Sequence, residues 1–161
     1  MLNIGIIGCG LIGFKRAAAI GNKAKLVACA DINFSRAKSL ANKYENVDAY
    51  NSWEKLLNNS NIDIVIISTL HDSLAELTSA CIKKGKHILV EKPAARNALE
   101  LKSVLKLANS SSSKIHVGFN HRYHRAFIKA KSLIEDDKLG ELMFIRARYG
   151  HGARIGYEKE W

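Results

Sequence analysis

Short apolar runs alternate along most of the chain with stretches in which apolar residues recur every three or four positions. The runs have the length of buried strands, and the recurring positions mark one face of a helix. The predicted strands are 2–7, 25–30, 47–50, 62–67, 87–90 and 115–119. Helices are predicted at 11–20 and 34–43, briefly after Ser52, and after the capping positions Asp72 or Ser73 and Asn97. Strands that alternate with helices through short connections are typical of a parallel sheet covered on both faces.

This pattern predicts an α/β fold, a doubly wound parallel sheet with strand order 3-2-1-4-5-6 that is complete by Asn120. Residues 121–137 then carry a helical stripe, and residues 142–149 alternate in the manner of a strand. A single strand without a partner is a liability, so we interpret it as the start of a second, truncated α+β domain. The expected domains are therefore 1–120 and 121–161.

Three glycines follow the first predicted strand. Gly8, Gly10 and Gly13 have G-x-G-x-x-G spacing, and the helical pattern begins at Leu11. In a dinucleotide site the first glycine permits the tight turn, the second lets the backbone approach a pyrophosphate, and the third lets the helix pack closely. The diphosphate then lies on free N–H groups at the helix start. The spacing alone is a weak signal, but the preceding strand and following helix favour a dinucleotide site over a turn without a ligand.

The second predicted strand ends at an acid, Asp31. A right-handed crossover places this strand beside the first one, so the acid lies at the same edge of the sheet as the glycines. A carboxylate there accepts hydrogen bonds from the adenosine ribose hydroxyls and repels a 2′-phosphate, which favours NAD over NADP. Arg36 would weaken that preference if it reached the same ribose. Asp31 could also cap the next helix, and the two roles are compatible.

Two further segments leave predicted strands at the edge where ligands bind in open α/β sheets. The first segment holds Ser68, Thr69, Leu70 and His71. The second holds Glu91, Lys92 and Pro93, the only proline in the chain. A rigid turn at this proline would fix Lys92 in place, and the peptide bond before it can be cis or trans.

The composition is typical of a soluble globular protein, with 47% hydrophobic and 25% charged residues among 161. No apolar run approaches the roughly 20 residues of a membrane span, and no basic segment of a signal peptide precedes the first strand. We therefore expect a cytoplasmic protein without a membrane partner. The net charge of +10 is spread along the helices. Without aromatic–basic interleaving, this charge predicts a solvated surface rather than a nucleic-acid partner.

The cysteines and histidines form no recognisable metal motif. Cys9, Cys29 and Cys81 are odd in number and lack C-x-x-C spacing, which favours buried thiols over disulfides or zinc. Cys9 lies among the glycines, where it could be modified. His121 and His124 could share a helix face, but no Cys, Asp or Glu in the same stretch completes a ligand set. No metal site is expected.

These segments together resemble the Gfo/Idh/MocA oxidoreductase family. The match rests on G-I-I-G-C-G-L-I-G (5–13), Asp31, Glu91-Lys92-Pro93 and G-F-N-H-R-Y-H (118–124). Residues 146–161 resemble a branch of sugar and nucleotide-sugar dehydrogenases. The resemblance implies an N-terminal Rossmann domain followed by an α+β domain, which supplies much of the substrate pocket and often a homo-oligomer interface. Family members are usually much longer, so this chain resembles their first half.

The resemblance implies an NAD-dependent dehydrogenase that oxidises a CH–OH group of a sugar or nucleotide sugar by hydride transfer. The pyrophosphate would be held by Gly8, Gly10, Leu11, Ile12 and Gly13, and the adenosine ribose by Asp31. The nicotinamide side would be lined by Ser68, Thr69, Leu70 and His71, with Glu91 on the ribose. Lys92 would reach the substrate hydroxyl as the catalytic residue. The substrate cleft would be lined by Asn120, Arg122 and His124, for which a solvated basic turn is the alternative.

Two departures from the family pattern bear on these roles. The family often has Thr-Pro-Asn with a histidine three residues later, where this chain has Leu70, His71 and Leu74. The family's usual catalytic aspartate and histidine lie beyond residue 161. Lysine is almost fully protonated at neutral pH, so Lys92 alone is a poor base. We therefore expect binding of NAD(H) with little or no turnover. The alternative is a catalytically inactive NAD-binding module with a sensing or scaffold role.

Overall fold

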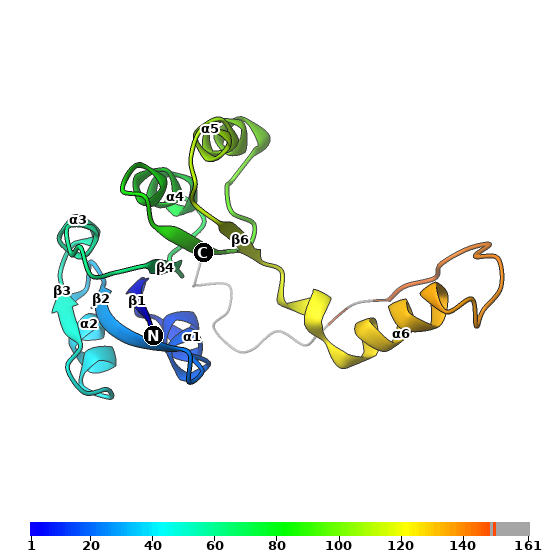
Figure 1. Cartoon of the computed structure of the whole chain (residues 1–161), viewed down its shortest axis with the longest axis horizontal. Coiled ribbons are helices and arrows are strands. Elements are labelled where there is room, and N and C mark those ends of the chain that lie inside the picture. Colours follow the sequence, from blue (N-terminus) through cyan, green and yellow to red (C-terminus); the bar gives the residue numbers. More distant parts are fainter. Residues whose placement is uncertain (149, 151–161) are drawn as a thin grey trace. The chain divides into compact units, whose positions relative to one another are not determined.

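The computed structural model of the chain describes residues 1–148 and 150, and it divides into two units, Met1–Phe119 and Asn120–Trp161. The first unit alternates strands and helices throughout (Figure 1). Its elements are β1 (Leu2–Ile7), α1 (Leu11–Ala18), β2 (Ala24–Ala30), α2 (Phe34–Ala41), β3 (Asp48–Tyr50), α3 (Trp53–Leu57), β4 (Ile64–Ile67), α4 (Leu74–Lys83), β5 (His87–Glu91), α5 (Ala98–Asn109) and β6 (Ile115–Gly118).

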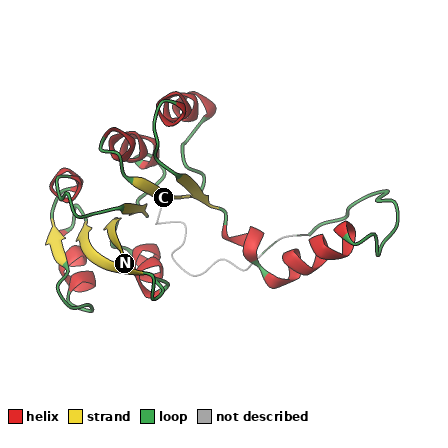
Figure 2. Cartoon of the chain, in the orientation of Figure 1, coloured by secondary structure: helices red, strands yellow, loops and turns green. Residues whose placement is uncertain are grey.

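The strands form one parallel sheet in the order β3-β2-β1-β4-β5-β6, which confirms the predicted order (Figure 2). The order of the strands reverses between β1 and β4, which are hydrogen-bonded neighbours at the centre of the sheet. Ile7 at the end of β1 is in register with Ala30 and with Ile67, and Ile67 is in register with Val90. The carboxyl ends of four strands therefore meet at one edge, beside the switch point where open α/β sheets bind ligands.

Apolar side chains leave both faces of the sheet. Ile6 and Ile66 pack in a cluster with the inner residues of α1 and α2. Ile7 and Ile67, one position further along each strand, pack with residues of α3, α4 and α5. The two groups of helices accordingly cover opposite faces (Figure 1). Burial on both faces explains why these strands are near-continuous apolar runs in the sequence.

Polar side chains define where the helices start. Asn33 caps α2, Ser52 caps α3 by accepting from Lys55 N at 3.3 Å, and Asn97 caps α5 by accepting from two backbone N–H groups at 3.0 Å. Ser73 stands at the N-cap of α4, but its hydroxyl instead bonds Thr69 Oγ1 and Leu70 O. Gly85 follows α4 with a φ of +68°, a conformation that suits glycine at a helix end.

The second unit begins with a 3₁₀ turn, η1 (Asn120–Tyr123), followed by α6 (Arg125–Glu135). The helix predicted over 121–137 is thus shorter than expected, because its first residues form the 3₁₀ turn and His124 is the N-cap. The strand predicted over 142–149 is absent from residues 142–148, and Tyr149 lies outside the described residues. Alternating side chains alone do not make a strand, because its backbone groups need a neighbouring strand to pair with.

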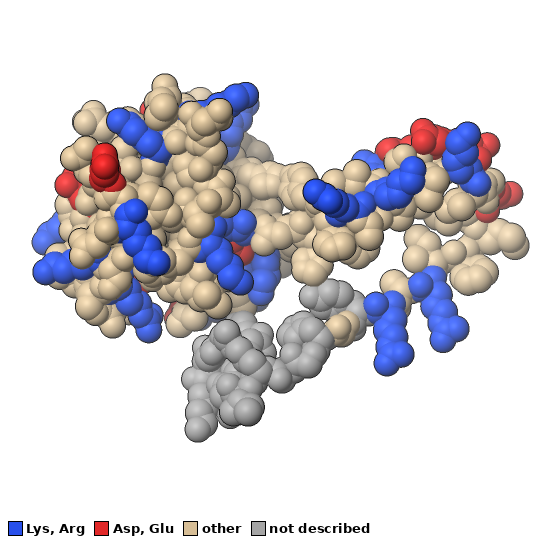
Figure 3. Space-filling model, turned by 90° about the horizontal axis from the view of Figure 1, so that it is seen from below, with Lys and Arg blue, Asp and Glu red and all other residues tan. Residues whose placement is uncertain are grey.

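Positive charge is dispersed over one face of the molecule. Lys and Arg side chains are scattered over the face seen in Figure 3, with uncharged residues between them. The net charge of +10 therefore does not gather into one basic patch on that face. No helix in the described part of the chain is long and apolar enough to cross a membrane.

Candidate functional site

The glycine turn, residues 8–13, is packed tightly against the end of β4. Gly8 has a φ of +94°, which glycine adopts far more readily than other residues. A Cβ at Gly8 would also lie 2.6 Å from the carbonyl carbon and oxygen of Ser68. Gly8 N donates to Ala30 O at 2.9 Å, which holds the turn to the end of β2. Conformation and space thus both exclude a side chain at this position.

The two other glycines of the turn face different surroundings. A Cβ at Gly13 would lie 2.1 Å from Gly8 O, so Gly13 lets α1 pack directly on the turn. A Cβ at Gly10 would meet no atom within 4 Å. The glycine turn is therefore closed at Gly8 and Gly13 and open at Gly10, where a ligand can approach the backbone.

Helix α1 starts at this open side. Gly10 is its N-cap, so no side chain caps the helix, and Phe14 N donates to Gly10 O at 3.0 Å. The N–H groups of Leu11 and Ile12 precede that bond at the positive end of the helix, and both residues are exposed. Free N–H groups beside a glycine without a side chain suit a diphosphate. The local structure therefore fits the pyrophosphate of a dinucleotide.

Asp31 lies beside the glycine turn at the end of β2. Its Oδ2 accepts from Cys9 N and its Oδ1 accepts from Asn33 N, both at 2.8 Å. The alternative that Asp31 caps α2 is wrong, because Asn33 Oδ1 accepts from Ser35 N and fills that role. An ionised carboxylate has about four acceptor positions, so two remain for further donors. The half-buried carboxylate is thus fixed by the turn and can still accept bonds from a ribose.

The segment after β4 is joined to the glycine turn through Ser68. Its hydroxyl donates to Gly8 O at 2.8 Å, and its N–H donates to Ile7 O at 2.8 Å. Thr69 Oγ1 accepts from Ser73 Oγ at 2.9 Å, and His71 is half-buried. Leu70 is 64% exposed. The segment therefore braces the glycine turn with Ser68 and presents an apolar side chain at Leu70.

An ion pair joins α1 to the end of β5. Arg16 Nε donates to Glu91 Oε1 at 2.6 Å, and Arg16 Nη2 contacts the same oxygen. The Arg16 and Glu91 side chains are only 20% and 12% exposed. Gly118 at the end of β6 leaves room for them, because a Cβ there would lie 3.1 Å from Arg16 Nη2. The Arg16–Glu91 pair thus connects α1 to β5 in the space left by Gly118 of β6, and no local pattern in the sequence indicated it.

Glu91 also begins a tight turn that carries Lys92. Ala94 N donates to Glu91 O at 3.0 Å, the Lys92–Pro93 peptide bond is cis, and Ala94 has a φ of +75°. These features match a β-turn with cis-proline at its third position. Lys92 is exposed, directly after the Arg16–Glu91 pair. A cation is therefore held at the strand edge where Asp31 and the glycine turn also lie.

The residues predicted to line the substrate cleft belong to the second unit. Asn120 and Arg122 lie in η1, and all three predicted residues are exposed. His124 Nδ1 accepts from Ala126 N at 3.3 Å, so its ring caps α6. The sequence did not indicate this capping role. Contact of these residues with a substrate stays a prediction.

The three thiols are free and buried. A hydrogen bond with Cys29, together with burial, raises the pKa of Cys9, and burial raises the pKa of Cys81 to about 12. Protonated thiols in apolar surroundings are poor nucleophiles. Cys9, which is 1% exposed, is thus poorly placed for the modification considered from the sequence. Among residues 1–148 and 150, no three His, Cys, Asp or Glu side chains are grouped to hold a metal ion.

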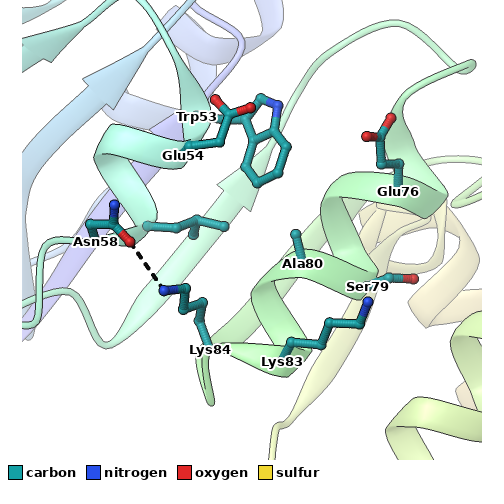
Figure 4. A pocket seen from close by; sticks show the side chains of 9 residues that line it. Trp53, Glu54, Asn58, Glu76, Ser79, Ala80, Lys83 and Lys84 are labelled. Atoms are coloured by element: carbon teal, nitrogen blue, oxygen red, sulfur yellow. Dashed lines mark hydrogen bonds between the residues drawn. The ribbon is translucent and has the colours of Figure 1, made fainter.

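A hollow of about 510 Å³ lies between α3 and α4 (Figure 4). Its apolar lining comes from Trp53, Leu57 and Ala80, and charged side chains from both helices surround it. Lys84 Nζ donates to Asn58 Oδ1 at 3.0 Å across one end. None of the residues predicted to bind cofactor or substrate lines this hollow, so it is separate from the glycine turn.

Comparison with known proteins identifies the family. Residues 2–119 match the Gfo/Idh/MocA family model, described as an oxidoreductase family with an NAD-binding Rossmann fold. The chain belongs to this family. The matched residues comprise the whole first unit except its initial methionine, and they include the glycine turn, Asp31 and the Lys92 turn. Family membership therefore agrees with a dinucleotide site at this edge of the sheet.

Relatives of the chain include proteins named as inositol dehydrogenases. The chain is 26% identical to an inositol 2-dehydrogenase of Salmonella typhimurium over 159 residues. The aligned residues cover 96% of this chain and 47% of the relative. The chain is 29% identical over 147 residues to a myo-inositol 2-dehydrogenase of Thermotoga maritima, covering 90% and 44%. A solved NAD-binding oxidoreductase from Klebsiella pneumoniae is 31% identical, with a TM-score of 0.76 over 87% of this chain and 40% of that one. The chain thus spans less than half the length of these relatives.

Proposed function

We propose that this chain is the cofactor-binding part of an NAD-dependent dehydrogenase that oxidises a CH–OH group of a sugar, nucleotide sugar or related polyol. The observation that carries the proposal is the grouping of the glycine turn, Asp31 and Lys92 at one edge of the sheet. The open backbone at Gly10 supports a dinucleotide as the ligand. The names of the inositol dehydrogenases among the relatives support a sugar-like substrate.

The proposed cofactor contacts follow the edge of the sheet. Gly8, Gly10, Leu11, Ile12 and Gly13 hold the pyrophosphate, and Asp31 accepts bonds from the adenosine ribose. The nicotinamide half lies over Ser68, Thr69, Leu70 and His71 and reaches Glu91. The charge of Asp31 opposes a 2′-phosphate, which supports NAD rather than NADP.

Lys92 is proposed to act on the substrate oxygen. NAD, when bound, supplies the ring that accepts hydride from the substrate carbon. An ammonium group can donate to the hydroxyl oxygen and orient it, but it cannot accept the proton that leaves. Lys92 therefore positions the substrate, and a further base completes the proton transfer. Asn120, Arg122 and His124 are proposed to contact the remaining hydroxyl groups.

The second unit is proposed to begin the substrate domain, through which the whole protein forms a homo-oligomer. Large apolar side chains of this unit, including Phe127, Ile128 and Phe144, are exposed. Apolar surface of this kind is stabilised by burial against another domain or subunit. The expected division into 1–120 and 121–161 accordingly stays part of the proposal.

Turnover with a panel of polyols tests the proposed function. The protein is mixed with NAD⁺ and myo-inositol, or with sugars and nucleotide sugars, and reduction of NAD⁺ is followed by absorbance at the NADH band. A polyol-dependent rate that falls at least about ten-fold in Lys92→Ala supports the proposal. Because a further base is needed, NADH binding with little or no polyol-dependent rate is the result expected of this chain by itself, and vigorous turnover would contradict the need for that base. A folded protein that binds no NADH contradicts both the dehydrogenase and the inactive NAD-binding module.

A further inference from the structure

We propose that Arg16 sets the preference of the site between oxidised and reduced cofactor by neutralising Glu91 beside the nicotinamide. Arg16 lies on α1, and it contacts Glu91 at the end of β5, 75 residues further along the chain. This tuning role rests on the proposed function, because it requires the nicotinamide half of NAD to lie near Glu91.

The geometry of the Arg16–Glu91 pair indicates an interaction between fixed charges. Two guanidinium nitrogens contact one carboxylate oxygen, and both side chains are mostly buried. Gly118 provides the space, since a Cβ there would approach Arg16 Nη2 to 3.1 Å and the Glu91 oxygens to 3.4 Å. An exposed ion pair elsewhere in the first unit, Arg96 with Glu100, lacks this enclosure because Arg96 is 58% exposed.

The arrangement of strands locates the pair with respect to a dinucleotide. A bound dinucleotide would place its pyrophosphate at the glycine turn after β1 and its adenosine half toward Asp31, which directly follows β2. The nicotinamide half must therefore extend the other way, over β4 and toward β5. Neighbouring strands lie about 4.8 Å apart, so Glu91 at the end of β5 is roughly 10 Å from β1, within the span of this half.

The charge of the nicotinamide ring distinguishes the two forms of the cofactor at this place. The ring carries one positive charge in NAD⁺ and none in NADH. A lone carboxylate nearby would favour NAD⁺, whereas a carboxylate paired with a guanidinium has little net field at the ring. The ring would lie between the pyrophosphate and Glu91, so roughly 10 Å is an upper bound on the separation of the two charges. At that separation in a partly solvated site, Coulomb's law gives a change of about two-fold to fifteen-fold in relative affinity.

The test is a double-mutant cycle of four proteins, in which Arg16 and Glu91 are replaced one at a time and then together. Dissociation constants for NAD⁺ and NADH are measured by calorimetry at pH 8 for the wild type, Arg16→Gln, Glu91→Gln and the double variant. The ratio of the NAD⁺ constant to the NADH constant should fall about two-fold to fifteen-fold in Arg16→Gln. The ratio should rise by a similar factor in Glu91→Gln and return close to the wild-type ratio in the double variant.

Arg96→Gln is the matched control, because it breaks an arginine–glutamate pair of the same unit that is exposed, where solvent weakens the field of its charges. It should leave the ratio of the NAD⁺ constant to the NADH constant unchanged.

If Arg16→Gln and Glu91→Gln weaken the binding of both nucleotides equally, or leave it unchanged, that ratio stays constant. The tuning role is then overturned while cofactor binding stands. If the folded wild type binds neither nucleotide, the proposed function fails and the tuning role fails with it.

Discussion

The carboxylate of Asp31 combines a structural contact with a proposed ligand contact. Its two oxygens accept from the N–H groups of Cys9 and Asn33, so the side chain is fixed before any ligand arrives. A group held in its binding geometry loses little conformational entropy when the ligand binds. The same contact anchors the glycine turn, since Cys9 lies between Gly8 and Gly10.

Replacing Asp31 tests the choice between NAD and NADP. Asp31→Ala removes the acceptor for the ribose hydroxyls and the charge that repels a 2′-phosphate, so the preference for NADH over NADPH should fall by about ten-fold or more. Fluorescence titration with both nucleotides gives the ratio of affinities. Asp31→Asn retains the size of the side chain but not its charge, and it separates the two effects. An unchanged ratio in both variants would exclude Asp31 as the ribose ligand.

Residues with a local signature could be predicted from the sequence, and those with distant partners could not. Gly8, Gly13 and Asp31 stand at fixed places around a strand end, so their surroundings followed from the pattern. The Arg16–Glu91 pair joins residues 75 positions apart, and nothing near Arg16 indicates its partner. The buried Lys86 is a similar case, because its Nζ donates at 2.7 Å to Ile62 O, which lies 24 residues earlier in the chain and just before β4.

At the scale of elements, the glycine turn and α1 form one structural motif with a closed side and an open side. The closed side is defined by Gly8 and Gly13, where added atoms would collide with backbone. The open side is defined by Gly10, where added atoms would meet none of the protein. Folding and ligand binding therefore depend on different glycines of one motif.

Two alanine substitutions test separately whether folding depends on Gly13 and whether ligand binding depends on Gly10. Gly13→Ala places a Cβ against Gly8 O and should lower the free energy of unfolding by about 3 kcal/mol. Gly10→Ala should change stability by less than about 1 kcal/mol, because its φ of −79° suits alanine and the space is empty. It should nevertheless weaken NADH binding about ten-fold or more, since the new methyl group lies where the diphosphate approaches.

Chemical denaturation measures the stability of both variants, and a fluorescence titration measures their affinity for NADH. Gly21→Ala is a suitable control, because a Cβ there also meets nothing within 4 Å and Gly21 lies outside the glycine turn. If Gly10→Ala binds NADH as tightly as the control, the pyrophosphate does not lie on this backbone.

The elements of the first unit were predictable because each buries apolar residues against a neighbour within the same unit. Strand order also followed, since crossover connections have one hand and the strands are apolar on both faces. The second unit shows where pattern reasoning fails. Residues 142–148 alternate like a strand but have no strand partner in the described part of the chain, and the start of α6 depends on the ring of His124.

At the scale of the whole molecule, the proposed cofactor contacts all lie in the first unit. The glycine turn, Asp31, Ser68 and Glu91 belong to one sheet edge, joined by hydrogen bonds and an ion pair that do not involve the second unit. The chain spans less than half the length of its relatives. Cofactor binding is therefore the part of the proposed function that this chain should perform by its own contacts.

Calorimetric titration of the chain with NADH tests this claim most directly. Circular dichroism first establishes that the protein is folded, and NADH is then added at moderate ionic strength. The expected result is saturable binding of about one NADH per chain, with a dissociation constant in the micromolar range typical of nucleotide sites. A folded protein that shows no binding heat at several temperatures, and no change in nicotinamide fluorescence, would contradict the assignment of the glycine turn as a dinucleotide site.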